Sequence, residues 1–184
     1  MQRNPYGTDA VQLAVDLVND PPADPDGLAQ RCRDAGVLVE AAPTRADLAA
    51  TERFLAAWLE VVDAETDADR AELLNRLLAR ASAYPRLTDH ADDGWHIHYR
   101  DPDMPLCAVL EALLSVGTAL HLVGRGMSRL GRCAVPECRR VFADVSRTGR
   151  QRYCSPTCSN RDAVRRHRAR AGSGSAASAG RRGG

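Results

Sequence analysis

Hydrophobic residues recur at helical spacing through most of the first 124 positions of the chain. Apolar side chains that return every three or four residues share one face of a helix, and that face can be buried. Thr44 and Thr66 each stand just before such a run, where a helix N-cap is expected. The pattern predicts helices over residues 10–19 and 27–35, one after Thr44, one after Thr66, and a long apolar helix over residues 105–123.

Between the last two of these helices the hydrophobic period changes from about four to two. Alternation over a few residues is typical of a strand with one buried face. Residues 84–89 and 95–99 are therefore predicted to form a hairpin, joined by residues 90–94. The fold class expected is α+β, with a helix-rich N-terminal domain that contains this small antiparallel hairpin.

Alternation in the second strand places Trp95, Ile97 and Tyr99 on the face expected to be half-buried. The opposite, polar face carries three candidate ligand-binding residues: His96, His98 and Arg100. Two histidines at this spacing can bind a metal, with His90 or His121 as a further ligand, but spacing fixes no third ligand and a solvent-facing polar side is favoured. The other reading is a pocket for an anionic small molecule, in which Arg100 pairs with a carboxylate or phosphate.

After residue 124 the pattern is polar and contains two pairs of cysteines. Four residues separate Cys133 from Cys138, and three separate Cys154 from Cys158. Fifteen residues lie between the two pairs. A structural zinc ion is bound by four ligands, often cysteine thiolates, that two short segments bring together. Two disulfides or four unrelated buried thiols are the alternatives; the first residues lack the apolar core of a signal peptide, so an oxidising compartment is not indicated. One structural zinc ion held by all four cysteines is expected.

The segments around the cysteines predict how such a finger would be built. Residues 140–145 and 150–153, joined by the polar turn 146–149, have the pattern of a β-hairpin. Ser155 followed by Pro156 is typical of a helix N-cap with proline at the first helical position. The order of knuckle, hairpin and helix is that of a treble-clef zinc finger.

Several segments of the chain carry recognisable motifs: residues 132–138, 142–149, 152–155 and 158–161 around the cysteines, and the weaker residues 13–19 and 73–75 upstream. In these segments the sequence resembles the CGNR-type zinc-finger proteins that carry an N-terminal ABATE domain. Two departures from the pattern are Ser159 in place of glycine and Tyr153 in place of tryptophan, and neither is a metal ligand. The resemblance implies a transcription regulator, linked to the stress response, whose first domain holds an unidentified ligand.

The charge of the chain also changes after residue 124. The first 124 residues carry 10 arginines and 21 acidic residues, whereas residues 125–184 carry 15 arginines and 3 acidic residues, so a net charge of +1 hides an acidic part and a basic part. All 25 basic residues are arginine, in the acidic part of the chain as well as in the basic part. The arginine content by itself is therefore weak evidence for phosphate binding. A basic segment joined to an acidic domain is typical of a nucleic-acid-binding module.

The predicted C-terminal helix carries most of the candidate nucleic-acid contacts. At about 100° per residue, four residues share one arc expected to face the finger: Asn160, Ala163, Val164 and His167. The candidate contacts are Arg150, Arg152, Arg161, Arg165, Arg166, Arg168 and Arg170. Arginine forks grip phosphates and read guanine. The alternative is a solvated helix with an Asp162–Arg166 pair, but one acidic residue cannot neutralise five arginines.

The sequence thus predicts a zinc-dependent, DNA-binding transcription regulator, with an RNA-binding protein or a protein-interaction module as alternatives. Walker loops, dinucleotide-binding units and nucleophile elbows are absent from the sequence, so no enzyme is expected. The expected division is an ABATE-like domain over residues 1–124, a finger over residues 125–170 and a disordered Gly/Ser/Ala-rich tail over residues 171–184. A cytoplasmic protein, associated with the nucleoid when bound to DNA, is expected; no membrane-spanning run is apparent, and a homodimer is left open.

Overall fold

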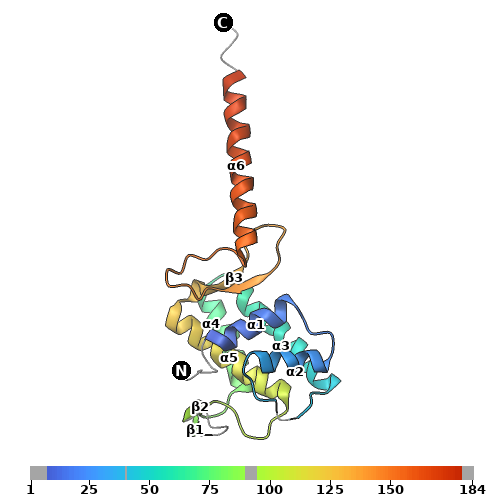
Figure 1. Ribbon diagram of the computed structural model, residues 1–184. Coiled ribbons are helices and arrows are strands. Elements are labelled where there is room, and N and C mark those ends of the chain that lie inside the picture. Colours follow the sequence, from blue (N-terminus) through green and yellow to red (C-terminus); the bar gives the residue numbers. More distant parts are fainter. Residues whose placement is uncertain (1–7, 40, 90–94, 180–184) are drawn as a thin grey trace.

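The computed structural model describes residues 8–39, 41–89 and 95–179. Within them lie six α-helices, one short 3-10 helix and two antiparallel pairs of strands (Figure 1). The structure is therefore α+β and rich in helices, as the sequence predicts. The elements in chain order are α1 (Thr8–Asn19), α2 (Pro25–Asp34), α3 (Arg45–Asp63), α4 (Asp67–Ala81), β1 (Arg86–Thr88), β2 (His96–His98), α5 (Leu106–Arg125), η1 (Met127–Arg129), β3 (Leu130–Arg132), β4 (Val141–Ala143) and α6 (Pro156–Ala179).

The long helix α5 lies at the centre of the core and packs against α1, α3 and α4. Leu110 and Leu114 of α5 are fully buried, and Thr118 accepts a hydrogen bond of 2.9 Å from the indole of buried Trp58. Contrary to expectation, α5 is by length and composition apolar enough to cross a membrane, the one such helix in the described chain. Its most apolar stretch is 61% buried inside the protein, so the helical core accounts for its composition.

Polar residues cap α3 and α4 as their sequences predict. Thr44 accepts a hydrogen bond from the Asp47 amide at 3.2 Å, and the Asp47 carboxylate accepts one from the Thr44 amide at 2.8 Å. Thr66 accepts a hydrogen bond from the Asp69 amide at 3.1 Å. Each cap satisfies backbone groups that the first turn leaves without a helical partner, and so fixes where the helix begins.

The hairpin of β1 and β2 forms, but its faces are reversed from the prediction. Leu87 pairs with Ile97 across the two strands, and both side chains are exposed, as is Trp95. His96 and His98 are instead partly buried. Alternation defines two faces but does not say which one is buried, and here the polar face of β2 is the more buried one. Tyr99, just after β2, is partly buried as predicted. Residues 90–94, which include His90 and the predicted turn, lie outside the described residues.

The second predicted hairpin is wrong in its pairing. β4 pairs with β3, in the register Leu130↔Ala143 and Arg132↔Val141, and not with residues 150–153, which are not in a strand. The cysteine knuckle between β3 and β4 reverses the chain, so the strands that flank it become neighbours. Leu130, Val141 and Ala143 are buried in the same cluster as the helices of the first 124 residues.

Helix α6 projects away from the rest of the molecule as a rod (Figure 1). The arc predicted to face the finger does not do so, because Asn160, Ala163, Val164 and His167 are all exposed. Among residues 156–170 of the helix, the buried ones are Cys158 and Asp162, one turn apart near its start.

The same helix runs past residue 170 to Ala179, into the segment for which the sequence predicts disorder. The alanines there are strong helix formers, and each residue added to an existing helix gains a backbone hydrogen bond without a new nucleation step.

Candidate zinc centre and nucleic-acid interface

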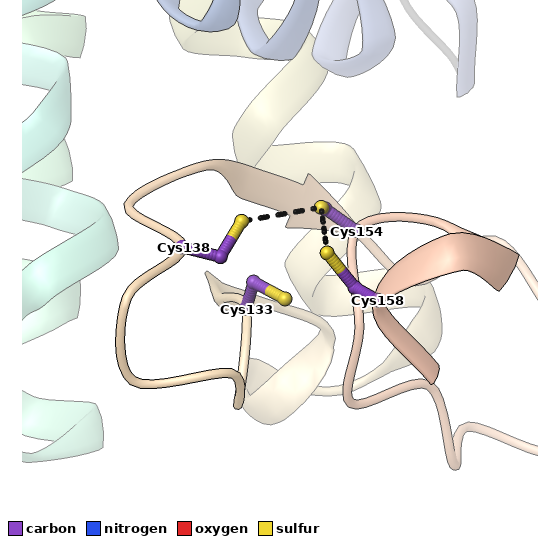
Figure 2. A group of neighbouring side chains, drawn as sticks. All are labelled: Cys133, Cys138, Cys154 and Cys158. Atoms are coloured by element: carbon purple, nitrogen blue, oxygen red, sulfur yellow. Dashed lines mark hydrogen bonds between the residues drawn. The ribbon is translucent and has the colours of Figure 1, made fainter. Parts of the chain in front are cut away.

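The four predicted ligands come together at one point, between the β3–β4 knuckle and the start of α6 (Figure 2). All four sulfur atoms of Cys133, Cys138, Cys154 and Cys158 lie within 4.8 Å of one another. The Cys154 sulfur is 3.7 Å from that of Cys138 and 3.7 Å from that of Cys158. A tetrahedral zinc ion with Zn–S bonds of about 2.3 Å holds its sulfurs roughly 3.7 to 3.8 Å apart, so this group fits one zinc ion.

The cluster is not a pair of disulfides. All six cysteines of the chain are free thiols. The 3.7 Å sulfur separations exceed the S–S bond length of about 2.05 Å, so the alternative of two disulfides is excluded. Cys32 and Cys107 lie apart from the cluster, in α2 and α5.

Local backbone bonds prepare both halves of the site. The Cys138 amide donates to the Val135 carbonyl at 2.9 Å, which closes the knuckle. In the second half, the Ser155 hydroxyl accepts a hydrogen bond from the Cys158 amide at 3.2 Å, the N-cap predicted from the sequence. Burial, helped by the neighbouring sulfurs, raises the pKa of the Cys154 thiol to about 12. Four thiolates can therefore coexist here only with a cation between them, and zinc supplies that charge.

Asp144 organises the loop between the two cysteine pairs. It is almost fully buried and accepts hydrogen bonds from the Ser146 amide at 2.8 Å and the Gln151 amide at 3.0 Å. The Arg129 guanidinium lies 3.4 Å from Oδ2 of Asp144, the oxygen that accepts from the Gln151 amide. Burial alone would raise the pKa of Asp144, but these hydrogen bonds and Arg129 hold it below the ordinary value. The loop therefore closes on a carboxylate instead of pairing as a strand, which the sequence pattern did not reveal.

Asp162 fixes the first turns of α6 to the finger. Its carboxylate accepts a hydrogen bond from the Tyr153 hydroxyl at 2.7 Å. The same carboxylate pairs with Arg165, and with Arg166 at 2.9 Å. The Tyr153 hydroxyl lowers the pKa of Asp162, and both arginines add to the effect. The pairing of Asp162 with Arg166 is the one expected from the sequence.

The zinc centre is also tied to the helices of the first 124 residues. Arg132 of β3 forms a two-pronged ion pair with Asp63 at the end of α3, at 2.6 and 2.7 Å. Buried Arg70 donates to the Val61 carbonyl at 3.1 Å and also binds the Met127 carbonyl. Together with the shared hydrophobic cluster, these contacts hold β3 and β4 against α1 and α3.

Comparison with known families identifies both parts of the chain. Residues 129–171 match the CGNR zinc finger. Residues 11–130, well over half of the chain, match the family named ABATE, described as "Putative stress-induced transcription regulator". The chain belongs to the ABATE family. No curated protein matches it. Both families are those whose motifs the sequence resembles; one is regulatory and the other a zinc finger, and neither is an enzyme family.

The arginines predicted to contact nucleic acid differ in whether an acidic side chain lies beside them. Glu137 of the knuckle lies 3.9 Å from Arg161 and 3.7 Å from Arg165, so these two, with Arg166, have acidic neighbours. Arg150 and Arg168 form no ion pair with an acidic residue in the described part of the chain. All seven arginines predicted as nucleic-acid contacts are exposed, including Arg152, which lies over the Tyr153 ring, and Arg170.

The ABATE domain brings the predicted ligand-binding residues to one side of the hairpin. The His96 and His98 rings meet with their Nε2 atoms 3.0 Å apart. His98 and Arg100 line a pocket of about 270 Å³ together with Arg86, which the sequence analysis missed. Arg86 lies opposite His98 in the adjacent strand, so the register of the hairpin, unknown from the sequence, places it there.

No third metal ligand from the described residues joins the two histidines, and His90 lies outside those residues. Among the described residues, the four cysteines are the one group of three or more side chains that could hold a metal. His121 lies in α5, where its Nε2 is 3.3 Å from the Arg129 carbonyl. The ABATE domain thus offers a basic pocket and not a second metal centre within the described part of the chain.

Proposed function

We propose that the chain is a zinc-dependent, DNA-binding transcription regulator in which the CGNR finger contacts the DNA. The observation that carries this proposal is the placement of α6: it begins at the zinc ligands, leaves the body of the protein and exposes its arginines. A helix fixed at one end and free along its sides fits the major groove, where arginine can contact phosphates and guanine. The zinc ion is structural, because four thiolates fill its coordination sphere.

The acidic neighbours divide the arginines by role. Arg150 and Arg168 pair with no acidic residue of the described chain, so a phosphate can bind them without displacing a carboxylate. Arg161 and Arg165 share Glu137, and a phosphate there competes with it. We therefore expect Arg150 and Arg168 to contribute more to phosphate binding than Arg161.

Titration of fluorescent duplex DNA at several salt concentrations tests this function. Each phosphate contact removed reduces the slope of log affinity against log salt by about 0.9 on duplex DNA. Arg150→Gln and Arg168→Gln are each expected to reduce the slope by about that amount. Arg53→Gln is the matched control, because Arg53 is also exposed but lies on α3 within the acidic ABATE domain.

Competition with structured RNA and with an acidic protein at the same salt separates the alternatives. DNA binding predicts that duplex DNA competes best. If the RNA or the acidic protein displaces the DNA at lower concentration, the finger is an RNA-binding or protein-interaction module instead. Equal slopes for the natural chain and for both variants would contradict the assignment of Arg150 and Arg168.

The same proposal assigns ligand binding to residues 1–124 and nucleic-acid binding to residues 125–170. The pocket beside the hairpin presents Arg86, His98 and Arg100, which suit a small carboxylate or phosphate ester. Asp103 also lines it and Asp101 lies 3.5 Å from Arg86, so an anion bound there competes with these carboxylates for Arg86. A screen of such anions by thermal unfolding should find compounds that raise the melting temperature. Arg100→Gln should abolish the shift, and Arg80→Gln, an exposed arginine on α4, should preserve it. A shift that survives Arg100→Gln would place the ligand elsewhere.

A further inference from the structure

The carboxylate of Asp162 lies where α6 leaves the finger. Its side chain is only 8% exposed, and it accepts a hydrogen bond of 2.7 Å from the Tyr153 hydroxyl. Cys158, four residues earlier, belongs to the zinc centre, and Arg166, four residues later, has a side chain that is 56% exposed. Residues spaced by four share one stripe of a helix. Arg166 therefore continues the stripe that is anchored in the finger, about 6 Å further along the helix axis than Asp162.

Arg166 meets this carboxylate in a way that leaves the outer end of its side chain available. The ion pair joins Nε of Arg166 to Oδ2 of Asp162 at 2.9 Å. Within the described part of the chain, the terminal nitrogens Nη1 and Nη2 of Arg166 form no hydrogen bond. Arg165 instead directs Nη2 to Asp162 and Nη1 to Glu137, and Arg161 approaches Glu137 through Nη1. Among these three arginines, Arg166 is the one that a buried carboxylate holds and whose terminal fork is still available.

A fork held in this way suits the edge of a guanine better than a phosphate. The two terminal nitrogens of an arginine can donate to O6 and N7 of guanine in the major groove. A side chain that is already ordered loses less freedom on binding, and the ion pair with Asp162 restrains Arg166 in advance. The same carboxylate repels a phosphate, which carries a full negative charge, more than it repels the neutral edge of a base. Arg168, which pairs with no acidic residue of the described chain, lacks this restraint and remains suited to phosphate.

The surroundings of Arg166 allow base edges to come close. The residues three positions before and after it, Ala163 and Ala169, are exposed and lie on the same side of the helix. Their small side chains leave room for α6 to approach a base pair. Arg152 lies over the ring of Tyr153 at 5.9 Å, so an arginine of the loop lies beside the residue that binds the buried carboxylate. That loop arginine can hold the DNA backbone next to the same site.

We propose that Arg166 reads a guanine in the major groove of the DNA and that Asp162 positions it for this contact. The proposal rests on the DNA binding proposed above and adds the residue that determines which sequence is bound. Arg150 and Arg168 then supply attraction to phosphates that does not depend on sequence, and Arg166 supplies the choice of base. Because its contact is with a base, Arg166 should affect the preferred sequence far more than the salt dependence of binding.

Selection of bound duplexes from a random pool by the full-length, zinc-loaded chain tests the proposal. The natural chain is expected to enrich sites with guanine at one fixed position, and replacing that base pair should weaken binding roughly 5- to 150-fold. Arg166→Gln should lose the preference for guanine at that position. Arg168→Gln is the matched control, because it removes the same charge from the same helix: it should reduce the salt slope for every duplex and still prefer the guanine.

Asp162→Asn separates positioning from folding. The amide oxygen can still accept a hydrogen bond from the Tyr153 hydroxyl, but the charge that holds Arg166 is gone. The preference for guanine should therefore weaken. Binding to duplexes without the preferred site should become tighter, because the finger gains net positive charge. A merely structural role of Asp162 predicts instead that both kinds of binding weaken together, and the zinc content of each variant shows whether its finger is intact.

The outcomes distinguish this proposal from DNA binding itself. A natural chain that binds no duplex overturns both. If the natural chain binds every sequence equally, or if Arg166→Gln still prefers the guanine, DNA binding stands but Arg166 does not read the base. Weaker binding of Asp162→Asn to all duplexes, with its zinc retained, would contradict the positioning role of the carboxylate.

Discussion

The side-chain amide of Asn19 binds the backbone of Val141 through both of its polar atoms. Its Nδ2 donates to the Val141 carbonyl at 2.9 Å, and its Oδ1 accepts from the Val141 amide at 2.9 Å. The amide thus satisfies both backbone groups of a residue in β4, as a neighbouring strand would. One residue at the end of α1 in this way fixes the position of a strand that flanks the zinc centre.

Replacing Asn19 with alanine should lower the free energy of unfolding by about 2 kcal/mol. Two hydrogen bonds are lost, and the amide and carbonyl of buried Val141 are left without these partners. Urea unfolding followed by circular dichroism measures the change. Asn75→Ala, at an exposed position of α4, should change it by less than about 0.5 kcal/mol. An equal effect of the two substitutions would contradict the role of Asn19.

His121 is a second residue whose surroundings predict a measurable property. The side chain is buried, and its Nδ1 has no hydrogen-bond partner in the described structure. Burial lowers the pKa of His121, and the positive charges of Arg125 and Arg129 lower it further, against the opposing Arg129 carbonyl and Asp144. The folded protein therefore keeps this imidazole neutral at pH values where the unfolded chain protonates it.

Stability should accordingly fall as the pH drops below about 6.5, the ordinary pKa of histidine. The unfolded chain then binds a proton that the folded chain does not, so the free energy of unfolding decreases by at most about 1.4 kcal/mol per pH unit. Urea titrations at pH 7.5 and 5.5 with excess zinc measure this loss. His121→Gln keeps a donor for the Arg129 carbonyl and should lose less stability on acidification. The exposed His167→Gln is the matched control, and an identical pH dependence in all three chains would refute the argument.

At the scale of elements, α1 and α5 approach each other closely at Gly117. A Cβ atom built on Gly117 would lie 2.4 Å from the Cβ of Ala10, well inside contact distance. The missing side chain therefore lets the two helices meet, and α1 carries Asn19 to β4 at its far end. The position of α1 against α5 thus affects the zinc-binding part of the chain.

Gly117→Ala should destabilise the protein by about 1 to 3 kcal/mol, because overpacking exceeds the gain in helix propensity. Adding Ala10→Gly removes the clashing atom and should recover part of this loss. Gly124→Ala in the same helix is the matched control: no atom lies within 4 Å of its added Cβ, so it should be neutral or stabilising by up to about 1 kcal/mol. Thermal unfolding of these three variants and of the natural chain measures the changes in stability. A stable Gly117→Ala would mean that α1 can shift without cost.

The elements differ in how far the sequence predicts them. The caps at Thr44 and Thr66 depend on residues within one turn, and the cysteine spacing carries its own chemistry, so both were predicted. The partner of β4 and the covered face of β2 depend on residues far away in the chain, and both predictions were wrong. Asp144 was missed because its partners surround it only after the loop has closed.

At the scale of the whole molecule, the acidic N-terminal part and the basic C-terminal part share one hydrophobic core. β3 and β4 lie within the finger match at residues 129–171, yet Leu130 and Val141 are buried with the helices of the ABATE domain. The Arg132–Asp63 pair crosses the same junction. The division after residue 124 remains a prediction, and the junction implies that the two parts stabilise each other.

Removal of zinc should therefore destabilise the whole chain and not the finger alone. Without the metal, four crowded thiols no longer hold the knuckle, and β3 and β4 loosen. Losing part of the burial of Leu130 and Val141 costs about 3 kcal/mol, which lowers the melting temperature of a chain of this size by roughly 10 °C. Calorimetry should show one transition in both states, moved to lower temperature by a chelator. Cys154→Ser, which lacks a ligand, should melt at the lower temperature with or without chelator. Two separate transitions, with the larger one unmoved by the chelator, would mean that the ABATE domain is stable without its finger.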